Sequence, residues 1–314
     1  MKIAVSGCLL GQSIRFDKQH KRDTFIMDEL SAYAEFVSFC PEHLAFGSPR
    51  SSIRMVKEDE KLNIISNKTG DNLTAVLLEK SNQELEKIKS KNISAIILKS
   101  KSPTCGLMSS KVYQTNGYVE AKDDGVFAAL CKKEFRYLPM EEEGRLNDPW
   151  LRENFVMQVF AYDDFENFKK NAQMKDLVAF HQNYKFLLQS KDENIYRELG
   201  KIVGNHESKP FETILEEYED KFKIAISKKS SIGKTRNVLE HMAGFVKNFL
   251  NQEEKKFLHE QISDYANKIL PVIVPLSTLK IYATKYEVAY LLGQKFLNPY
   301  PKELALRSNI KSVK

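Results

Sequence analysis

Four cysteines are the residues of this 314-residue sequence best able to do chemistry: Cys8, Cys40, Cys105 and Cys131. In a reducing compartment a cysteine fills a core, acts as a nucleophile or binds a metal, so its surroundings must distinguish these roles. Structural zinc sites usually pair their ligands at short spacing, as in Cys-x-x-Cys, and this sequence has no such pair. Widely spaced thiolates suit an iron–sulfur cluster better, with zinc ligands or scattered core cysteines as the alternatives.

The first three cysteines each follow a short apolar run that predicts a β-strand. These runs are residues 3–5, 36–39 and 93–98. Because the carboxyl ends of parallel strands form one edge of an α/β sheet, where ligands bind, we expect the three thiols to meet there. Cys131 lies instead on the apolar face of a helix predicted after residues 123–125, where a buried and inert thiol is common.

Amphipathic stretches alternate with these strands, which is typical of an α/β fold around a mostly parallel, Rossmann-like sheet. Further helices are predicted near residues 24–33 and 72–89, and residues 55–65 predict a loop or small hairpin. The charged segment 140–149 ends in turn residues and predicts a junction. We therefore expect an α/β domain over residues 1–145.

Residues 146–314 are predicted to form a linking helix and an all-helical domain. The predicted helices lie near residues 177–188, 192–203, 210–227, 235–250 and 254–270. Pro271 and Pro275 are expected to end the last of these, and another helix is predicted from about Ser277.

Composition and charge narrow the class of protein. The sequence is 42% hydrophobic and 29% charged, and no run approaches the roughly 18 apolar residues of a membrane-spanning helix. The apolar run at the start, about four residues, is shorter than that of a secretory signal, so we expect a cytoplasmic protein. Net charge is +6, and the sequence from Lys221 onward contains 17 basic and 7 acidic residues. This excess indicates either a solvated lysine-rich surface or a surface for a polyanion, most simply RNA.

Three separated motifs resemble the thiouracil desulfidase family. They are Ser6-Gly7-Cys8-Leu9-Leu10-Gly11, Cys40-Pro41-Glu42 with Gly47-Ser48-Pro49-Arg50, and Lys99-Ser100-Lys101-Ser102-Pro103-Thr104-Cys105-Gly106. The second half, through motifs such as Phe180-His181 and His241-Met242, is similar to a helical domain often fused to desulfidases. The fused proteins are similar to tRNA 4-thiouridine desulfidases. Two departures stand out, because Thr104 replaces a more usual serine and Ser109-Ser110 replaces an expected charged pair with an arginine.

The resemblance implies a 4Fe-4S cluster on Cys8, Cys40 and Cys105, with the fourth iron open to the sulfur of a thiocarbonyl. It also implies that Glu42 is the catalytic glutamate and Ser102 the active-site serine. Water activated by Glu42 would then replace the sulfur, giving uridine and hydrogen sulfide without a redox change.

Charged side chains supply the expected contacts to substrate and RNA. Substrate contacts are expected from Arg15, Asp17, His20 and Arg50, unless the arginines pair with carboxylates that pin the loops. Contacts to tRNA are expected from Lys228, Lys229, Lys234 and Arg236 and from the tail residues Arg307, Lys311 and Lys314. Two other functions stay open: a desulfidase of free 2-thiouracil or thionucleosides whose helical half serves dimerisation or regulation, and a non-catalytic metal protein that senses oxygen or binds RNA.

Overall fold

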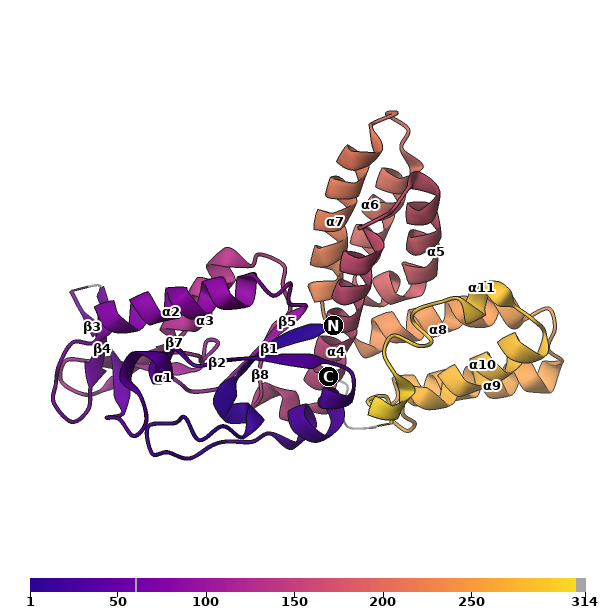
Figure 1. Ribbon diagram of the computed structural model, residues 1–314. Helices are drawn as coiled ribbons and strands as arrows, with labels where there is room; N and C mark the ends of the chain where they lie inside the picture. Colours follow the sequence, from indigo (N-terminus) through magenta and orange to yellow (C-terminus); the bar gives the residue numbers. More distant parts are fainter. Residues whose placement is uncertain (60, 309–314) are drawn as a thin grey trace. The chain divides into compact units, whose positions relative to one another are not determined.

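A computed structural model describes residues 1–59 and 61–308 (Figure 1). The chain divides into two compact units, Met1–Asn147 and a second unit that begins at Asp148. The first unit is α/β with a parallel sheet and the second is helical, which confirms the predicted fold class. No helix within the described residues has the length and apolar character needed to cross a membrane.

The sheet that carries the predicted strands is parallel throughout, in the order β2-β1-β5-β8. Its first three strands, β1 (Lys2–Ser6), β2 (Glu35–Phe39) and β5 (Ala95–Leu98), are those predicted from the apolar runs. The central residues of β1 and β5 are completely buried, as expected for strands covered on both faces, whereas the edge strand β2 alternates between buried and partly buried residues. The predicted helix at 72–89 is α2 (Thr74–Lys89).

The boundary between the two units lies inside the charged segment 140–149, but this segment begins with a strand that was not predicted. Met140–Glu142 forms β8, which pairs in parallel with β5. Charge in a strand this short is compatible with burial because Glu141 and Glu142 receive hydrogen bonds from neighbouring groups. The α/β unit therefore extends to residue 147.

The helix predicted over 24–33 is irregular. Phe25–Glu29 forms one π-helical turn and Leu30–Ala32 a 3-10 turn. The segment is fastened at its start, because the N–H of Asp23 donates to the carbonyl of Leu9. This tertiary anchor and the burial of Phe25 and Leu30 prevail over regular α-helical spacing.

A second sheet, in the order β4-β3-β6-β7, lies in the same unit. β3 (Ile53–Glu58) and β4 (Lys61–Ser66) confirm the hairpin alternative for residues 55–65. β6 (Ser110–Gln114) and β7 (Val119–Asp123) were not predicted, although Asn116-Gly117 between them is a hairpin signal. Apolar residues of this sheet pack with α2 and with the short helix α1 (Pro41–Phe46), so the sheet supports the segment after Cys40.

Helix α3 (Val126–Glu134) begins after residues 123–125, as predicted, and the elements that follow α3 are mainly helical. The helical unit contains α4 (Pro149–Phe168), α5 (Met174–Lys191), α6 (Glu193–Gly204), α7 (Phe211–Ser227), α8 (Ile232–Val246), α9 (Gln252–Ala266), α10 (Ile273–Lys285) and α11 (Ala289–Leu292). Helix α10 begins earlier than predicted, because Pro275 lies in its first turn, where a missing N–H costs no intrahelical hydrogen bond.

Candidate active site

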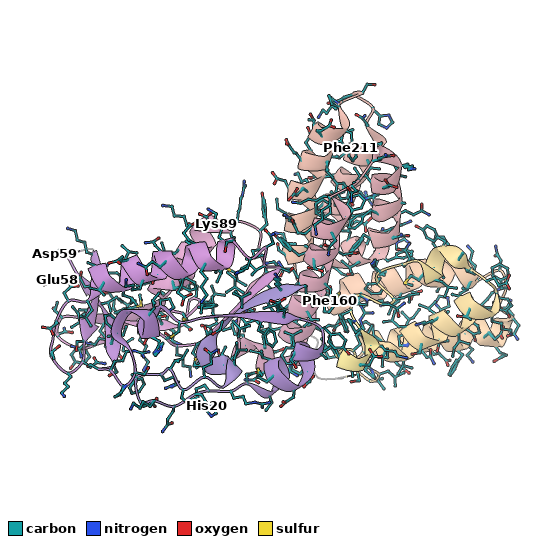
Figure 2. The ribbon with its side chains drawn as sticks, in the orientation of Figure 1. His20, Glu58, Asp59, Lys89, Phe160 and Phe211 are labelled. Carbon is teal, nitrogen blue, oxygen red and sulfur yellow. The ribbon has the colours of Figure 1, made fainter. Side chains whose placement is uncertain are left out.

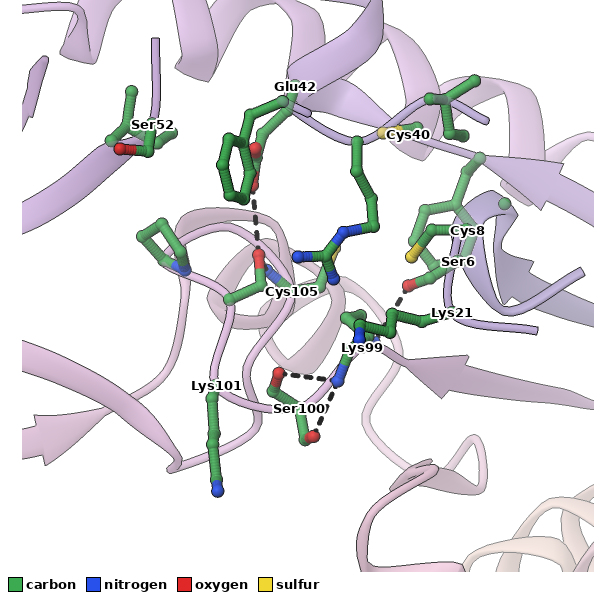
Figure 3. A pocket seen from close by; sticks show the side chains of 18 of the residues that line it. Ser6, Cys8, Lys21, Cys40, Glu42, Ser52, Lys99, Ser100, Lys101 and Cys105 are labelled. Carbon is green, nitrogen blue, oxygen red and sulfur yellow. Dashed lines mark hydrogen bonds between the residues drawn. The ribbon is translucent and has the colours of Figure 1, made fainter. Parts of the chain in front are cut away.

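The strand order brings three of the four cysteines to one cavity (Figure 3). Cys8 lies in the 3-10 turn after β1, Cys40 precedes α1 directly after β2, and Cys105 lies in the loop after β5. Because β2, β1 and β5 are neighbours, all three side chains line a cavity of about 360 Å³. Cys131 does not line this cavity and is fully buried in α3.

Burial controls the protonation of these thiols. It raises the pKa of Cys8 to about 11, against the opposing charges of Lys99 and Arg15. Burial, reinforced by the Glu42 carboxylate, raises the pKa of Cys40 to about 12, and the pKa of Cys105 is raised well above its ordinary value for the same main reason. The thiols of the metal-free protein are therefore protonated at neutral pH, and binding a metal there must release their protons.

The Cys105 loop is held by hydrogen bonds to its backbone. The hydroxyl of Ser102 accepts from the N–H groups of Thr104 (3.1 Å) and Cys105 (3.2 Å). The N–H groups at the start of α3 donate to carbonyls of the loop, for example Phe127 to Thr104 at 2.8 Å. Gly125 permits this approach, since a Cβ there would lie 2.5 Å from the carbonyl carbon of Thr104.

Ser109 and Ser110 stand where the family resemblance predicts a charged pair, and their hydroxyl groups help to hold this loop. Ser110 Oγ donates to the carbonyl of Ser102 at 2.6 Å, and Ser109 Oγ donates to Glu142. Glu142 also accepts the N–H of Leu107 at 2.7 Å. Two small hydroxyl residues and a buried carboxylate thus fasten the loop that presents Cys105.

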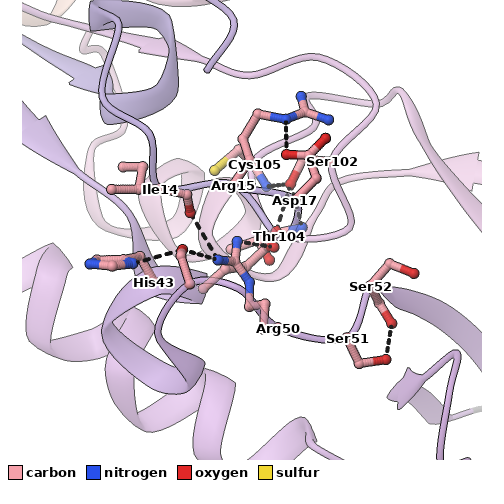
Figure 4. A network of polar contacts seen from close by, with 12 residues as sticks. Ile14, Arg15, Asp17, His43, Arg50, Ser51, Ser52, Ser102, Thr104 and Cys105 are labelled. Atoms are coloured by element: carbon pink, nitrogen blue, oxygen red, sulfur yellow. Dashed lines mark hydrogen bonds and ion pairs between the residues drawn. The ribbon is translucent and has the colours of Figure 1, made fainter. Parts of the chain in front are cut away.

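Glu42 and Ser102 meet in the cavity wall. Ser102 Oγ donates to Glu42 Oε1 at 3.1 Å, and Arg50 Nη2 donates to Glu42 Oε2 at 2.8 Å (Figures 3 and 4). Arg50 also donates to the carbonyl oxygens of Ile14 and Gly47. The predicted catalytic pair is therefore in contact, and Arg50 is paired with the carboxylate.

Other basic side chains line the same cavity. Lys99 pairs with Glu143 and donates to Ser100, whereas Lys21 and Lys101 are exposed residues of the cavity lining. Arg15 Nε lies 3.5 Å from Asp17 Oδ1 (Figure 4), and the Arg15 guanidinium lies over the Phe16 ring at 5.5 Å. The cavity thus offers cations to a ligand while containing one carboxylate, that of Glu42.

The structure does not bring every predicted contact residue to the cavity. Asp17 supports Arg15 from outside the lining, and His20 is exposed at the edge of the unit, where its Nδ1 accepts the N–H of Arg22 (Figure 2). Lys99 and Glu143 were missed by sequence reasoning, although each directly follows a strand of the parallel sheet. The strand-end rule that selected the cysteines also selects these two positions.

The predicted RNA contacts of the helical unit have different surroundings. Lys228 is exposed, and Lys229 lies over the Trp150 ring at 5.5 Å. Lys234 donates to the carbonyl of Lys191, and Arg236 lies 4.0 Å from Glu240. The prediction for Arg307 is wrong, because its guanidinium is buried and paired with Glu153 at 2.8 Å. Lys311 and Lys314 lie outside the described residues.

The three cavity cysteines offer soft donors to a metal. In the described parts of the chain, no group of three or more His, Cys, Asp or Glu side chains is arranged to hold one metal ion. Three thiols around a cavity of about 360 Å³ are the soft ligands that iron–sulfur clusters use. The neighbouring cations would offset the negative charge of such a thiolate-bound group.

The part of the chain that forms this cavity is similar to known proteins. The profile of the 2-thiouracil desulfurase family matches residues 3–143, which include all three cavity cysteines. A Bacillus subtilis protein, the uncharacterised YbbK, is 34% identical over 159 residues, which are 46% of this chain and 98% of YbbK. The chain belongs to the 2-thiouracil desulfurase family.

The helical unit of this desulfurase-family chain matches a second family. Residues 185–301 match a protein family of unknown function, DUF1722. The uncharacterised Escherichia coli protein YbgA is 24% identical over 154 residues, which are 48% of this chain and 91% of YbgA.

A further comparison is with a solved structure, that of the [4Fe-4S]-dependent thiouracil desulfidase TudS. The two sequences are 30% identical, and the match covers 46% of this chain and 93% of that chain at a TM-score of 0.38.

Proposed function

We propose that this protein removes sulfur from 4-thiouridine in tRNA, giving uridine and hydrogen sulfide, with a 4Fe-4S cluster on Cys8, Cys40 and Cys105. The observation that carries the proposal is that three strand-end thiols line the same cavity as the hydrogen-bonded pair Glu42 and Ser102. The same cofactor is named for TudS; for this chain the support is its own set of buried thiol donors.

The residues of the cavity suit hydrolytic replacement of sulfur by oxygen. A bound cluster with an open iron would act as a Lewis acid on the carbon–sulfur bond. Glu42 would take a proton from the attacking water and return it to the departing sulfur, so that one water enters and one hydrogen sulfide leaves. Ser102 would hold Glu42 Oε1 in the cavity wall during this exchange. Carbon and sulfur keep their oxidation states, so no external reductant is needed.

The cationic side chains that line the cavity favour RNA over a free thiobase as the substrate. Lys21 and Lys101 line the cavity as exposed residues, and Arg15, which is paired with Asp17 at 3.5 Å, lines it as well. A neutral thiouracil offers these cations no phosphate, whereas a thionucleotide in RNA does. To reach the cavity, the thiolated base would have to leave its stack in the tRNA.

The test compares three substrates on anaerobically reconstituted protein: thiolated tRNA, free 4-thiouridine and 2-thiouracil. We expect loss of near-ultraviolet thiouridine absorbance and release of sulfide with tRNA at much lower substrate concentration than with the free compounds. Turnover of 2-thiouracil with tRNA left unchanged would contradict the RNA substrate and support the free-base alternative. Cluster formation without turnover of any of the three would favour a non-catalytic protein.

Two variants refine this comparison. Lys21→Ala and Lys101→Ala should each raise the KM for tRNA. Each should also lower the slope of log KM against log salt concentration by about one, since each variant loses one phosphate contact. The KM for free 4-thiouridine should stay unchanged. Lys111→Ala is the matched control, because Lys111 is exposed on β6 and does not line the cavity.

A further inference from the structure

The terminal nitrogens of the Arg50 guanidinium donate hydrogen bonds to other groups of the protein. Nη2 donates to Glu42 Oε2 at 2.8 Å. Nη1 donates to the carbonyl oxygens of Ile14 (2.8 Å) and Gly47 (2.9 Å) and to Ser48 Oγ (3.0 Å). The Arg50 side chain is only 5% exposed, and its Nε is buried without a hydrogen-bond partner among the described residues. Both terminal nitrogens of Arg50 are therefore committed to protein acceptors, whereas Arg15 in the same cavity makes one ion pair, to Asp17.

The backbone around Arg50 is shaped to make these bonds. Gly47 ends α1 with φ +70° and ψ −163°, a conformation that is essentially restricted to glycine. Its N–H donates to the carbonyl of His43, while its own carbonyl faces the Arg50 guanidinium. The N–H of Arg50 donates to the carbonyl of Phe16. The arginine is thus anchored to two separate loops before it reaches Glu42.

The consequence for Glu42 is a fixed carboxylate. Oε2 is held by Arg50 and Oε1 by Ser102, so rotation of the carboxylate must break at least one hydrogen bond. A glutamate in the first turn of a six-residue helix otherwise has considerable side-chain freedom. Fixed orientation matters here, because a general base loses rate steeply when it is misplaced.

We infer that Arg50 is a positioning residue, which sets the orientation of Glu42 and does not contact the substrate. This inference rests on the proposed desulfidase function. Lysine cannot substitute, because its donors share one nitrogen and cannot reach Glu42 and the Ile14 and Gly47 carbonyls in the fixed fork of a guanidinium. Arg50 and Arg15 therefore have different roles, although both are arginines of one cavity.

The experiment is a double-mutant cycle on the reconstituted holoprotein, with kcat and KM measured for wild type, Arg50→Lys, Glu42→Gln and the double variant. Arg50→Lys should lower kcat roughly 10- to 100-fold, with KM within about threefold. In the Glu42→Gln background, the same change should alter kcat less than about twofold, because Arg50 acts through Glu42. Arg54→Lys, at an exposed position on β3, is the control.

Two results would overturn the inference: a KM effect that exceeds the kcat effect in Arg50→Lys, or additive losses of kcat in the double variant. A crystal structure of Arg50→Lys gives a readout without activity. We expect the Glu42–Ser102 contact to be lost there with the three cysteines in place, and a retained contact would refute positioning. An inactive wild-type protein would contradict the proposed function, whereas this structure would still decide the role of Arg50.

Discussion

Ser102 makes three hydrogen bonds with one hydroxyl group: it donates to Glu42 and accepts from the N–H groups of Thr104 and Cys105. A single side chain thus connects the proposed catalytic carboxylate to the loop of a proposed cluster ligand. The neighbouring hydroxyl of Thr104 is the opposite case, because it is buried and has no partner among the described residues.

This contrast predicts different outcomes for two small changes. Ser102→Ala should lower turnover at least about tenfold and lower the free energy of unfolding by roughly 1–3 kcal/mol, since two N–H groups lose their acceptor. Thr104→Val should preserve turnover and leave stability equal or higher, because it removes an unpaired buried hydroxyl at nearly constant volume. Steady-state kinetics and denaturant unfolding check both, and a Thr104→Val protein as damaged as Ser102→Ala would contradict this assignment.

Helix α3 and the Cys105 loop act together at the scale of elements. The N–H groups at the start of α3 close the loop, and Gly125 allows the two backbones to approach. In Gly125→Ala, the added Cβ would meet backbone atoms of Thr104 and Cys105 within 3 Å. We expect this variant to lose iron faster than wild type on dilution or exposure to chelator.

The matched control is Gly244→Ala on an exposed face of α8, where a Cβ meets nothing within 4 Å. Glycine to alanine in a helix should stabilise it by about 0.5–1 kcal/mol, with iron retention unchanged. Equal iron retention in Gly125→Ala and wild type would show that the close approach is unnecessary.

Sequence patterns predicted those elements whose signal is local. The apolar runs of β1, β2 and β5 and the periodicity of α2 are confirmed, and adjacency of the three strands explains why three distant thiols share a cavity. The irregular turn at Phe25–Glu29 and strand β8 depend on tertiary anchors that no short window contains. The pairing of Arg50 with Glu42 depends in the same way on loop geometry. The sequence indicated it only as an alternative, in which the arginines pair with carboxylates and hold the loops.

The helical unit contains a buried lysine. Lys191 in α5 is fully buried, and its Nζ donates to Asn154 Oδ1 at 2.6 Å. Burial lowers its pKa to about 7, partly opposed by the charge of Glu153. The folded pKa thus lies below the unfolded value of about 10.4.

Stability should therefore rise with pH through this window. Above pH 7 the unfolded chain binds a proton that the folded chain has released, so the free energy of unfolding should increase by on the order of 1 kcal/mol between about pH 7 and 8.5. The raised pKa values of the buried thiols act in the opposite direction only above their ordinary value of 9.0. Lys191→Met should remove this rise in denaturant unfolding curves, and an unchanged slope would exclude Lys191 as its source.

The central claim is that Cys8, Cys40 and Cys105 hold the cluster and Cys131 does not. The most direct measurement is the iron and acid-labile sulfide content of anaerobically reconstituted wild type and the four single Cys→Ala variants. We predict about four irons and four sulfides per chain for wild type and Cys131→Ala, and loss of most of both in each of the other three. Unchanged iron in Cys8→Ala, Cys40→Ala or Cys105→Ala, or loss of iron in Cys131→Ala alone, would contradict the account.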